Sequence, residues 1–159
     1  MIVAALIALA AAQAAPAPPP AAPAVSPNAD YHFNYLNSLD PAQGWHRTLS
    51  GLRYRRIGGT GSGPHPAPTD TVTIHYVGRF IDGRVFDSSR ARNEPATFPL
   101  NRLIKGWQEG VPMMRVGETW EFVIPAAIAY GDRDRPPIPP GSTLLFDIEL
   151  IAIPPADAV

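Results

Sequence analysis

From Gly51 onward the chain consists of short runs in which apolar and polar residues alternate, with turn-forming residues between the runs. The run TVTIHYVGRF (71–80) alternates strictly, which predicts a strand with one apolar and one polar face. The runs WEFVIP and LLFDIELIAI repeat the pattern, and Asp147 and Glu149 are expected to point outward. Asp82-Gly83 is a two-residue hairpin signal between two such runs. The pattern predicts several antiparallel strands.

This region offers a single helical stretch, KGWQEGV at 105–111. Pro112 limits it, because the residue before a proline disfavours the helical conformation. Several antiparallel strands and one short helix predict an α+β domain over 51–153, a curved antiparallel sheet wrapped around the helix. The sequence has no internal repeat, and no glycine-rich phosphate loop follows a strand.

The first fifteen residues are apolar and uncharged. A membrane-spanning helix needs about twenty such residues, so this run is short. It ends in Ala12-Gln13-Ala14, which fits the A-x-A pattern of a cleaved signal peptide. No Lys or Arg precedes the run; a mis-assigned start codon or an uncleaved anchor would explain that. We predict a signal peptide at 1–15 and a periplasmic protein, membrane-tethered if the signal is not cleaved.

Residues 16–27 are almost entirely Ala and Pro, which predicts an extended linker. A short helical segment is expected within 28–50, capped by Asn28 or Asp30 and ended near Pro41. We expect it to pack on the domain or to stay partly mobile, and 154–159 to form a tail. A weaker alternative is that the segment mediates dimerisation, but it is short, so a monomer is expected. Its apolar residues are Tyr31, Phe33, Tyr35, Leu36 and Leu39.

Composition removes several classes of function. A net charge of -1 provides no basic field, so nucleic acid is not an expected partner. The chain has no cysteine, which excludes disulfides, thiolate catalysis and zinc–thiolate sites. The four histidines, His32, His46, His65 and His75, share no metal-ligand spacing, and neither a metal nor a cofactor is expected.

Four sequence segments, in order over about a hundred residues, carry a resemblance to a known family. They are IHYVGRFIDGRVFDSSRARNEP, LIKGWQEGVPMMRVGE, IPAAIAYG and PPGSTLLFDIEL. The chain resembles FKBP-type peptidyl-prolyl cis–trans isomerases, and WHRTLSGLRY (45–54) resembles the lead-in of exported bacterial members. The resemblance implies the family fold and catalysis of rotation about X–Pro peptide bonds in exported proteins.

The resemblance also implies an apolar cup that receives the proline ring and the residue before it. Trp107 would form its floor, Tyr130 would offer its hydroxyl to a substrate carbonyl, and Asp87 would be a polar partner at the edge. Arg92 is expected to pair with Asp87. The remaining walls of the cup would be Tyr76, Phe86 and Phe146. Three aliphatic residues would complete the substrate-binding surface: Leu103, Ile104 and Ile138.

Three features depart from the family pattern. Ala96 stands where the family often has phenylalanine, which would open one side of the cup. The segment between Phe98 and Trp107 is shorter than in the best-known small members. The charged, proline-rich loop at 132–140 replaces a glycine-rich segment. These departures bear on substrate preference and on the placement of the loop.

Without the resemblance, Phe86, Trp107 and Phe146 would be interpreted as core residues, the usual role of aromatic side chains on alternating strands. With the resemblance, these aromatic residues are interpreted as the walls and floor of the cup. Isomerisation needs no nucleophile. Desolvation in an aromatic cup favours it, because the planar amide is more polar than the twisted amide and is destabilised more. The alternative is a low-activity proline-binding or chaperone module with the same pocket. A macrolide such as rapamycin is expected to compete for the cup.

Overall fold

The computed structural model describes residues 29–155, so the predicted signal peptide, the linker and most of the tail lie outside the described residues. The helices are α1 (Ala29–Asn37) and α2 (Lys105–Gly110). The single-turn 3-10 helices are η2 (Pro41–Gln43), η3 (Leu100–Arg102), η4 (Val111–Met113) and η5 (Ala126–Ile128). The strands are β1 (His46–Arg47), β2 (Arg53–Gly58), β3 (Thr71–Phe80), β4 (Val85–Ser88), β5 (Ala96–Pro99), β6 (Thr119–Ile124) and β7 (Leu144–Ala152).

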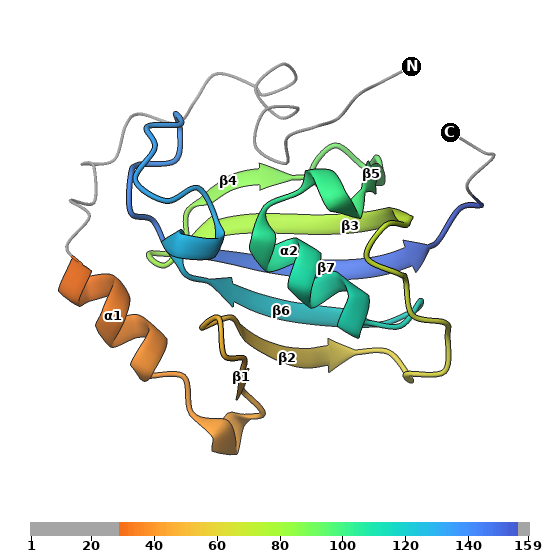
Figure 1. Cartoon of the computed structure of the whole chain (residues 1–159), viewed down its shortest axis with the longest axis horizontal. Coiled ribbons are helices and arrows are strands. Elements are labelled where there is room, and N and C mark those ends of the chain that lie inside the picture. Colours follow the sequence, from red (N-terminus) through yellow and green to blue (C-terminus); the bar gives the residue numbers. More distant parts are fainter. Residues whose placement is uncertain (1–28, 156–159) are drawn as a thin grey trace.

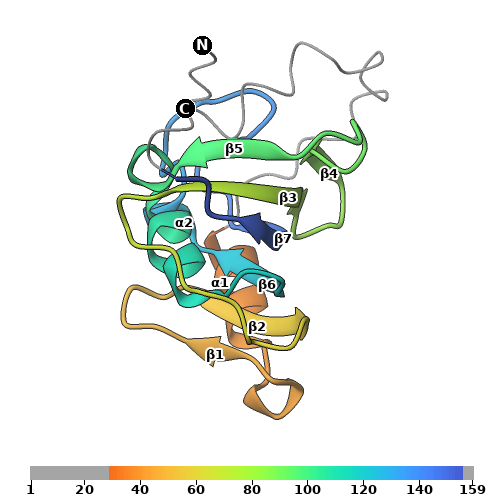
Figure 2. The same ribbon diagram turned by 90° about the vertical axis from the view of Figure 1, so that its right-hand side faces the viewer.

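The strands form one seven-stranded antiparallel sheet in the order β1-β2-β6-β7-β3-β4, with β5 also paired to β3. The long strand β3 carries β5 along its first half, where Val72 pairs with Phe98, and β4 along its second half, where Gly78 pairs with Asp87. Figure 1 shows α2 crossing one face of this sheet, and Figure 2 shows it to one side of the strands. The predicted α+β class, with one short helix on an antiparallel sheet, is confirmed.

The core lies between α2 and the sheet, because the alternating strands turn their apolar sides toward the helix. Val72, Ile74 and Tyr76 of β3 are fully buried, as the alternation predicts. Glycine lets the helix approach closely: a Cβ at Gly106 would lie 2.5 Å from Ile124 Cγ2, and one at Gly110 would lie 2.5 Å from Phe122 Cε1.

The opposite face of the sheet carries a second, smaller apolar cluster. It contains Trp45, Val123 and Leu145, against which Tyr35 and Leu36 of α1 pack. Since neighbouring residues of a strand point to opposite faces, β6 and β7 are buried on both sides here. The expected N-terminal helix is therefore present and packs on the domain.

Two details differ from the sequence expectations. In α1, Tyr31 and Phe33 are 41% and 65% exposed, so only part of the apolar set of this helix packs. The turn at Asp82-Gly83 is present, but residues 81–84 separate β3 from β4, so the connection is longer than two residues. Within residues 29–155, neither helix has the length and apolar composition needed to cross a bilayer.

Candidate active site

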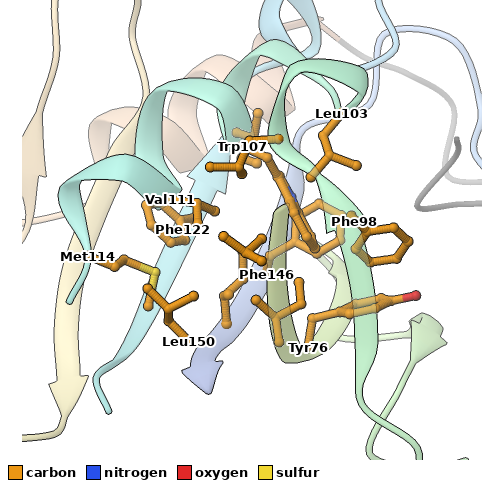
Figure 3. Close-up of a cluster of buried hydrophobic side chains, with 14 of the residues drawn as sticks. Tyr76, Phe98, Leu103, Trp107, Val111, Met114, Phe122, Phe146 and Leu150 are labelled. Carbon is orange, nitrogen blue, oxygen red and sulfur yellow. The ribbon is translucent and has the colours of Figure 1, made fainter. Parts of the chain in front are cut away.

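Four aromatic side chains meet on the face of the sheet that α2 covers, with Trp107 at their centre. The Trp107 ring lies edge-on to Phe146 at 5.1 Å and to Tyr76 at 5.5 Å between ring centroids. Phe86 adds a third edge-to-face contact, 5.6 Å from Phe146. In Figure 3, Trp107 projects from α2 toward Phe146 and Tyr76. The four predicted aromatic residues of the wall and floor therefore form one continuous cluster.

A polar triad supports one side of the cluster. The Tyr76 hydroxyl donates to Asp87 Oδ2 at 2.6 Å, and Arg92 Nη1 donates to Asp87 Oδ1 at 2.8 Å. Arg92 Nη2 also donates to Tyr76 Oη at 3.2 Å. Both carboxylate oxygens of Asp87, which is 3% exposed, are thus engaged within the protein. The expected Arg92–Asp87 pair is confirmed.

Burial, followed by the neighbouring Asp87 carboxylate, raises the pKa of Tyr76 well above its ordinary value. Burial alone lowers the pKa of Arg92, but its hydrogen bonds to Asp87 and Tyr76 outweigh that effect and raise it. Tyr76 is therefore a neutral hydroxyl and Arg92 a cation at any physiological pH. The triad acts as a fixed brace for the Tyr76 ring.

A cleft of about 470 Å³ opens beside the aromatic cluster. Leu103, Ile104 and Tyr130 line it, so three of the nine predicted site residues border the same open space. Trp107 does not line the cleft and is only 1% exposed, and Ile138 is buried to the same extent in the same apolar core. The nine predicted residues thus lie in one region, and the indole of Trp107 is buried below the residues that line the cleft.

Sequence reasoning missed two aromatic residues of this cluster. Phe98, from β5, lies 6.2 Å from Tyr76 and 6.4 Å from Trp107. Phe80, at the end of β3, lies 5.0 Å from Phe86. The apolar residues of these strands were visible in the sequence, but the pairing of β5 with the first half of β3, which brings Phe98 to Tyr76, was not.

Gly78 makes the packing of the outer wall possible. A Cβ at this position would lie 2.7 Å from Phe86 Cζ and 2.8 Å from Phe146 Cε1. The edge-to-face contact of these two rings therefore occupies the space that a side chain on β3 would fill.

The described residues, 29–155, contain no group of three or more His, Cys, Asp or Glu side chains placed to hold a metal ion. Three of the four histidines take part in hydrogen bonds, and the His32 ring accepts one from the Thr143 N–H. His65 Nδ1 lies 2.8 Å from the Met114 carbonyl oxygen, and His75 Nδ1 lies 3.0 Å from Ser89 Oγ.

Comparison with known proteins agrees with this fold. Residues 63–151 match the family model described as FKBP-type peptidyl-prolyl cis-trans isomerase. The chain belongs to this family. The FKBP match spans β3 to β7 and so contains every predicted site residue.

Bacterial FKBP-type proteins are among its similar relatives. The chain is 50% identical over 120 residues to the FKBP-type 22 kDa peptidyl-prolyl cis-trans isomerase of Escherichia coli K12, covering 75% of this chain and 58% of that protein. It is 47% identical over 105 residues to the outer membrane protein MIP of Legionella longbeachae, covering 65% and 45% of the two chains. It therefore spans about half the length of these relatives.

Among solved structures, the crystal structure of FkpA from Escherichia coli superposes with a TM-score of 0.77 at 39% sequence identity. The superposition covers 81% of this chain and 60% of that chain. At this identity, the likeness supports the family assignment as well as the fold.

Proposed function

We propose that this chain catalyses cis–trans isomerisation of X–Pro peptide bonds in polypeptides. The observation that carries the proposal is the Trp107-centred aromatic cluster beside a cleft lined by Ile104 and Tyr130, within the segment that matches the FKBP family. Such a surface can receive a proline ring on an apolar floor while a hydroxyl faces the neighbouring carbonyl.

Isomerisation of an X–Pro bond requires stabilisation of the twisted amide, which an apolar surface with one hydroxyl can provide. Rotation about an X–Pro bond is slow because amide resonance opposes twisting, with a barrier of about 18–20 kcal/mol. A million-fold acceleration requires about 8 kcal/mol of preferential stabilisation of the twisted amide. Transfer to an apolar site disfavours the planar, polar amide, and a hydrogen bond from Tyr130 to a substrate carbonyl adds to this preference. No cofactor or metal enters the scheme.

Access to the floor requires a local movement, because Trp107 and Ile138 are each 1% exposed. Ile138 belongs to the short turn in which the Ile138 N–H donates to the Arg135 carbonyl oxygen at 2.6 Å. We propose that displacement of this turn lets the proline ring reach the indole. In this arrangement Ile138 is the apolar lip of the proline site and Trp107 is its floor.

A protease-free isomerisation assay on a short X–Pro peptide tests the function. Tyr130→Phe, which removes one hydroxyl from the cleft, is expected to lower kcat/KM by about five- to ten-fold, the value of one hydrogen bond. Tyr54→Phe is the matched control, because Tyr54 stacks on Trp120 outside the cleft. Trp107→Ala is expected to abolish acceleration, with its circular dichroism spectrum recorded because it also removes a core residue.

If the folded wild-type chain accelerates no X–Pro peptide, the low-activity proline-binding or chaperone function replaces catalysis. Titration with rapamycin then shows whether the same surface binds a ligand: we propose micromolar or tighter binding, and calorimetry with no heat at that concentration contradicts it.

We further propose that the chain is exported to the periplasm by the signal peptide at 1–15, and that it is monomeric. The apolar first fifteen residues and the likeness to a protein named for the outer membrane support export. Expression of the full chain in a Gram-negative host should give a periplasmic protein whose mature mass lacks the leader. Retention of the leader in the membrane fraction would identify a tether instead, and light scattering would report the mass of the assembly.

A further inference from the structure

The cleft beside the aromatic cluster has an unusual charge. Besides Ile104 and Tyr130, four cationic side chains line it, and no aspartate or glutamate does. The cationic residues are Arg102, Lys105, Arg133 and Arg135. Lys105 is the single lysine of the sequence. The whole chain has a net charge of -1, so the positive charge of this cleft differs sharply from the charge of the chain as a whole.

Within residues 29–155, no carboxylate forms an ion pair with any of these four cations. Six arginines elsewhere do form such pairs. Asp132 and Asp134 alternate with two of the arginines along the loop, but neither carboxylate lines the cleft. Like charges held together without counterions raise the electrostatic potential of a concave surface and attract anionic groups to it.

Arg135 provides a second, independent indication. Its guanidinium carbon lies 5.4 Å from the centroid of the Tyr130 ring, so the group is held beside the residue proposed to contact substrate. Its Nη1 atom is fully buried and has no hydrogen-bond partner among residues 29–155. A buried donor without an acceptor is costly, by about 1–3 kcal/mol and more when charged, and a carboxylate in the cleft would remove that cost once the guanidinium turned toward it.

We propose that this cleft is a specificity site that binds an acidic side chain of the client polypeptide, a few residues from the X–Pro bond. The inference rests on the proposed function, since Ile104 and Tyr130 are shared by the cleft and the proposed proline site. A segment whose proline reaches the aromatic cluster therefore passes the four cations. Arginine suits this role because its planar fork pairs with a carboxylate through two parallel hydrogen bonds.

The test uses peptides of the form Ala-Ala-Leu-Pro-Ala-Ala, in which each Ala is replaced in turn by Glu, Gln or Lys. Isomerisation is followed by NMR exchange spectroscopy with the full chain. At one or more positions, Glu is expected to raise kcat/KM over Gln by about five-fold, the effect of one or two solvent-accessible ion pairs. This ratio should approach one in about 1 M salt, where charges are screened beyond ~3 Å.

Variants of the two exposed arginines, Arg102 and Arg133, assign the preference to the cleft. Arg102→Gln and Arg133→Gln should each lower the Glu-to-Gln ratio, and the double charge reversal Arg102→Glu with Arg133→Glu should make Lys the preferred residue. Arg47→Gln, an exposed arginine on β1 outside the cleft, is the matched control and should leave the ratio unchanged. Because each ratio is taken within one variant, a general loss of activity does not imitate the effect.

A ratio of one at every position overturns the inference while leaving catalysis intact. A ratio that persists in the double reversal also overturns it, because the preference then arises elsewhere. If no peptide is isomerised, the proposed function fails, and the cleft is tested by NMR titration with the Glu and Gln peptides. Tighter binding of the Glu peptide, with shifts at 102–105 and 129–135, supports the site, and equal binding refutes it. Arginine-dependent binding to phosphatidylglycerol vesicles, without any peptide preference, would assign the cleft to a membrane surface instead.

Discussion

The Tyr76–Asp87–Arg92 triad shows how a buried carboxylate is accommodated next to an aromatic cluster. Asp87 is buried at the edge of the cluster, and its carboxylate accepts hydrogen bonds from the hydroxyl of Tyr76 and the guanidinium of Arg92. A buried carboxylate is tolerated only when it is paired and fully hydrogen-bonded. The three residues therefore stabilise the wall as a unit.

Arg92→Ala is expected to lower the free energy of unfolding by about 2 kcal/mol, because it leaves the buried Asp87 carboxylate with one partner fewer. This is below the usual cost of breaking a buried pair, since the Arg92 side chain is 23% exposed. Arg90→Ala, which breaks a more exposed pair with Glu149, should cost less than about 1 kcal/mol. Urea unfolding of both variants provides the comparison, and equal losses would refute the special status of the triad.

At the scale of elements, the close approach of α2 to β6 determines the depth of the core. Gly106 and Gly110 face Ile124 and Phe122 at distances that leave no room for a methyl group. The same approach positions Trp107, which lies between them on the helix, against Phe146. Glycine is unfavourable inside a helix, so its presence here reflects packing rather than helix propensity.

Gly110→Ala should therefore destabilise the protein by about 1–3 kcal/mol, although alanine is the better helix former. Gly58→Ala is the control, because its added Cβ would make an ordinary contact with Thr119 at 3.5 Å. That variant should be as stable as the wild type or up to about 1 kcal/mol more stable. Thermal unfolding distinguishes the two, and a stabilised Gly110→Ala variant would show that α2 can move away from the sheet at little cost.

For the whole molecule, α1 ties the N-terminal segment to the face of the sheet opposite α2. Besides its apolar contacts, the helix is attached through His32, whose Nδ1 accepts the Thr143 N–H at 3.3 Å. Burial lowers the pKa of His32 below its ordinary value of 6.5. His32 lines a small cavity together with Asp82 and Arg84, which form an ion pair with each other. Only neutral histidine can accept this hydrogen bond.

Because the folded-state pKa of His32 is lowered, the unfolded chain binds more protons below about pH 6.5. The stability that neutral His32 contributes is present above that pH and is lost as the pH falls through the folded-state pKa. The difference in unfolding free energy between wild type and His32→Gln should therefore shrink from pH 7.5 to pH 5.5, by at most about 1.4 kcal/mol per pH unit. Urea unfolding at both pH values measures it, and a constant or growing difference contradicts the assignment.

Local sequence patterns determined most of the sheet, and the family resemblance supplied the candidate site residues. Alternation along 71–80 and 144–153 predicts which side chains enter the core, because successive residues of a strand point to opposite faces. The family's sequence segments supplied the candidate residues that the structure brings together around Trp107, and the expected pair of Arg92 with Asp87 is present. Such features depend on residues that are close together in the chain, so the sequence alone predicts them.

The tertiary structure alone decided the features that depend on segments far apart in the chain. Val123 and Leu145 are buried on the outer face because α1 covers them, and alternation cannot report a second covering layer. Phe98 joins the cluster through the pairing of β5 with β3. The basic cleft exists because residues 102–105 and 133–135 meet in space, about thirty positions apart in a chain whose net charge is -1. Burial and electrostatic potential are sums over spatial neighbours, and only the fold determines which residues those are.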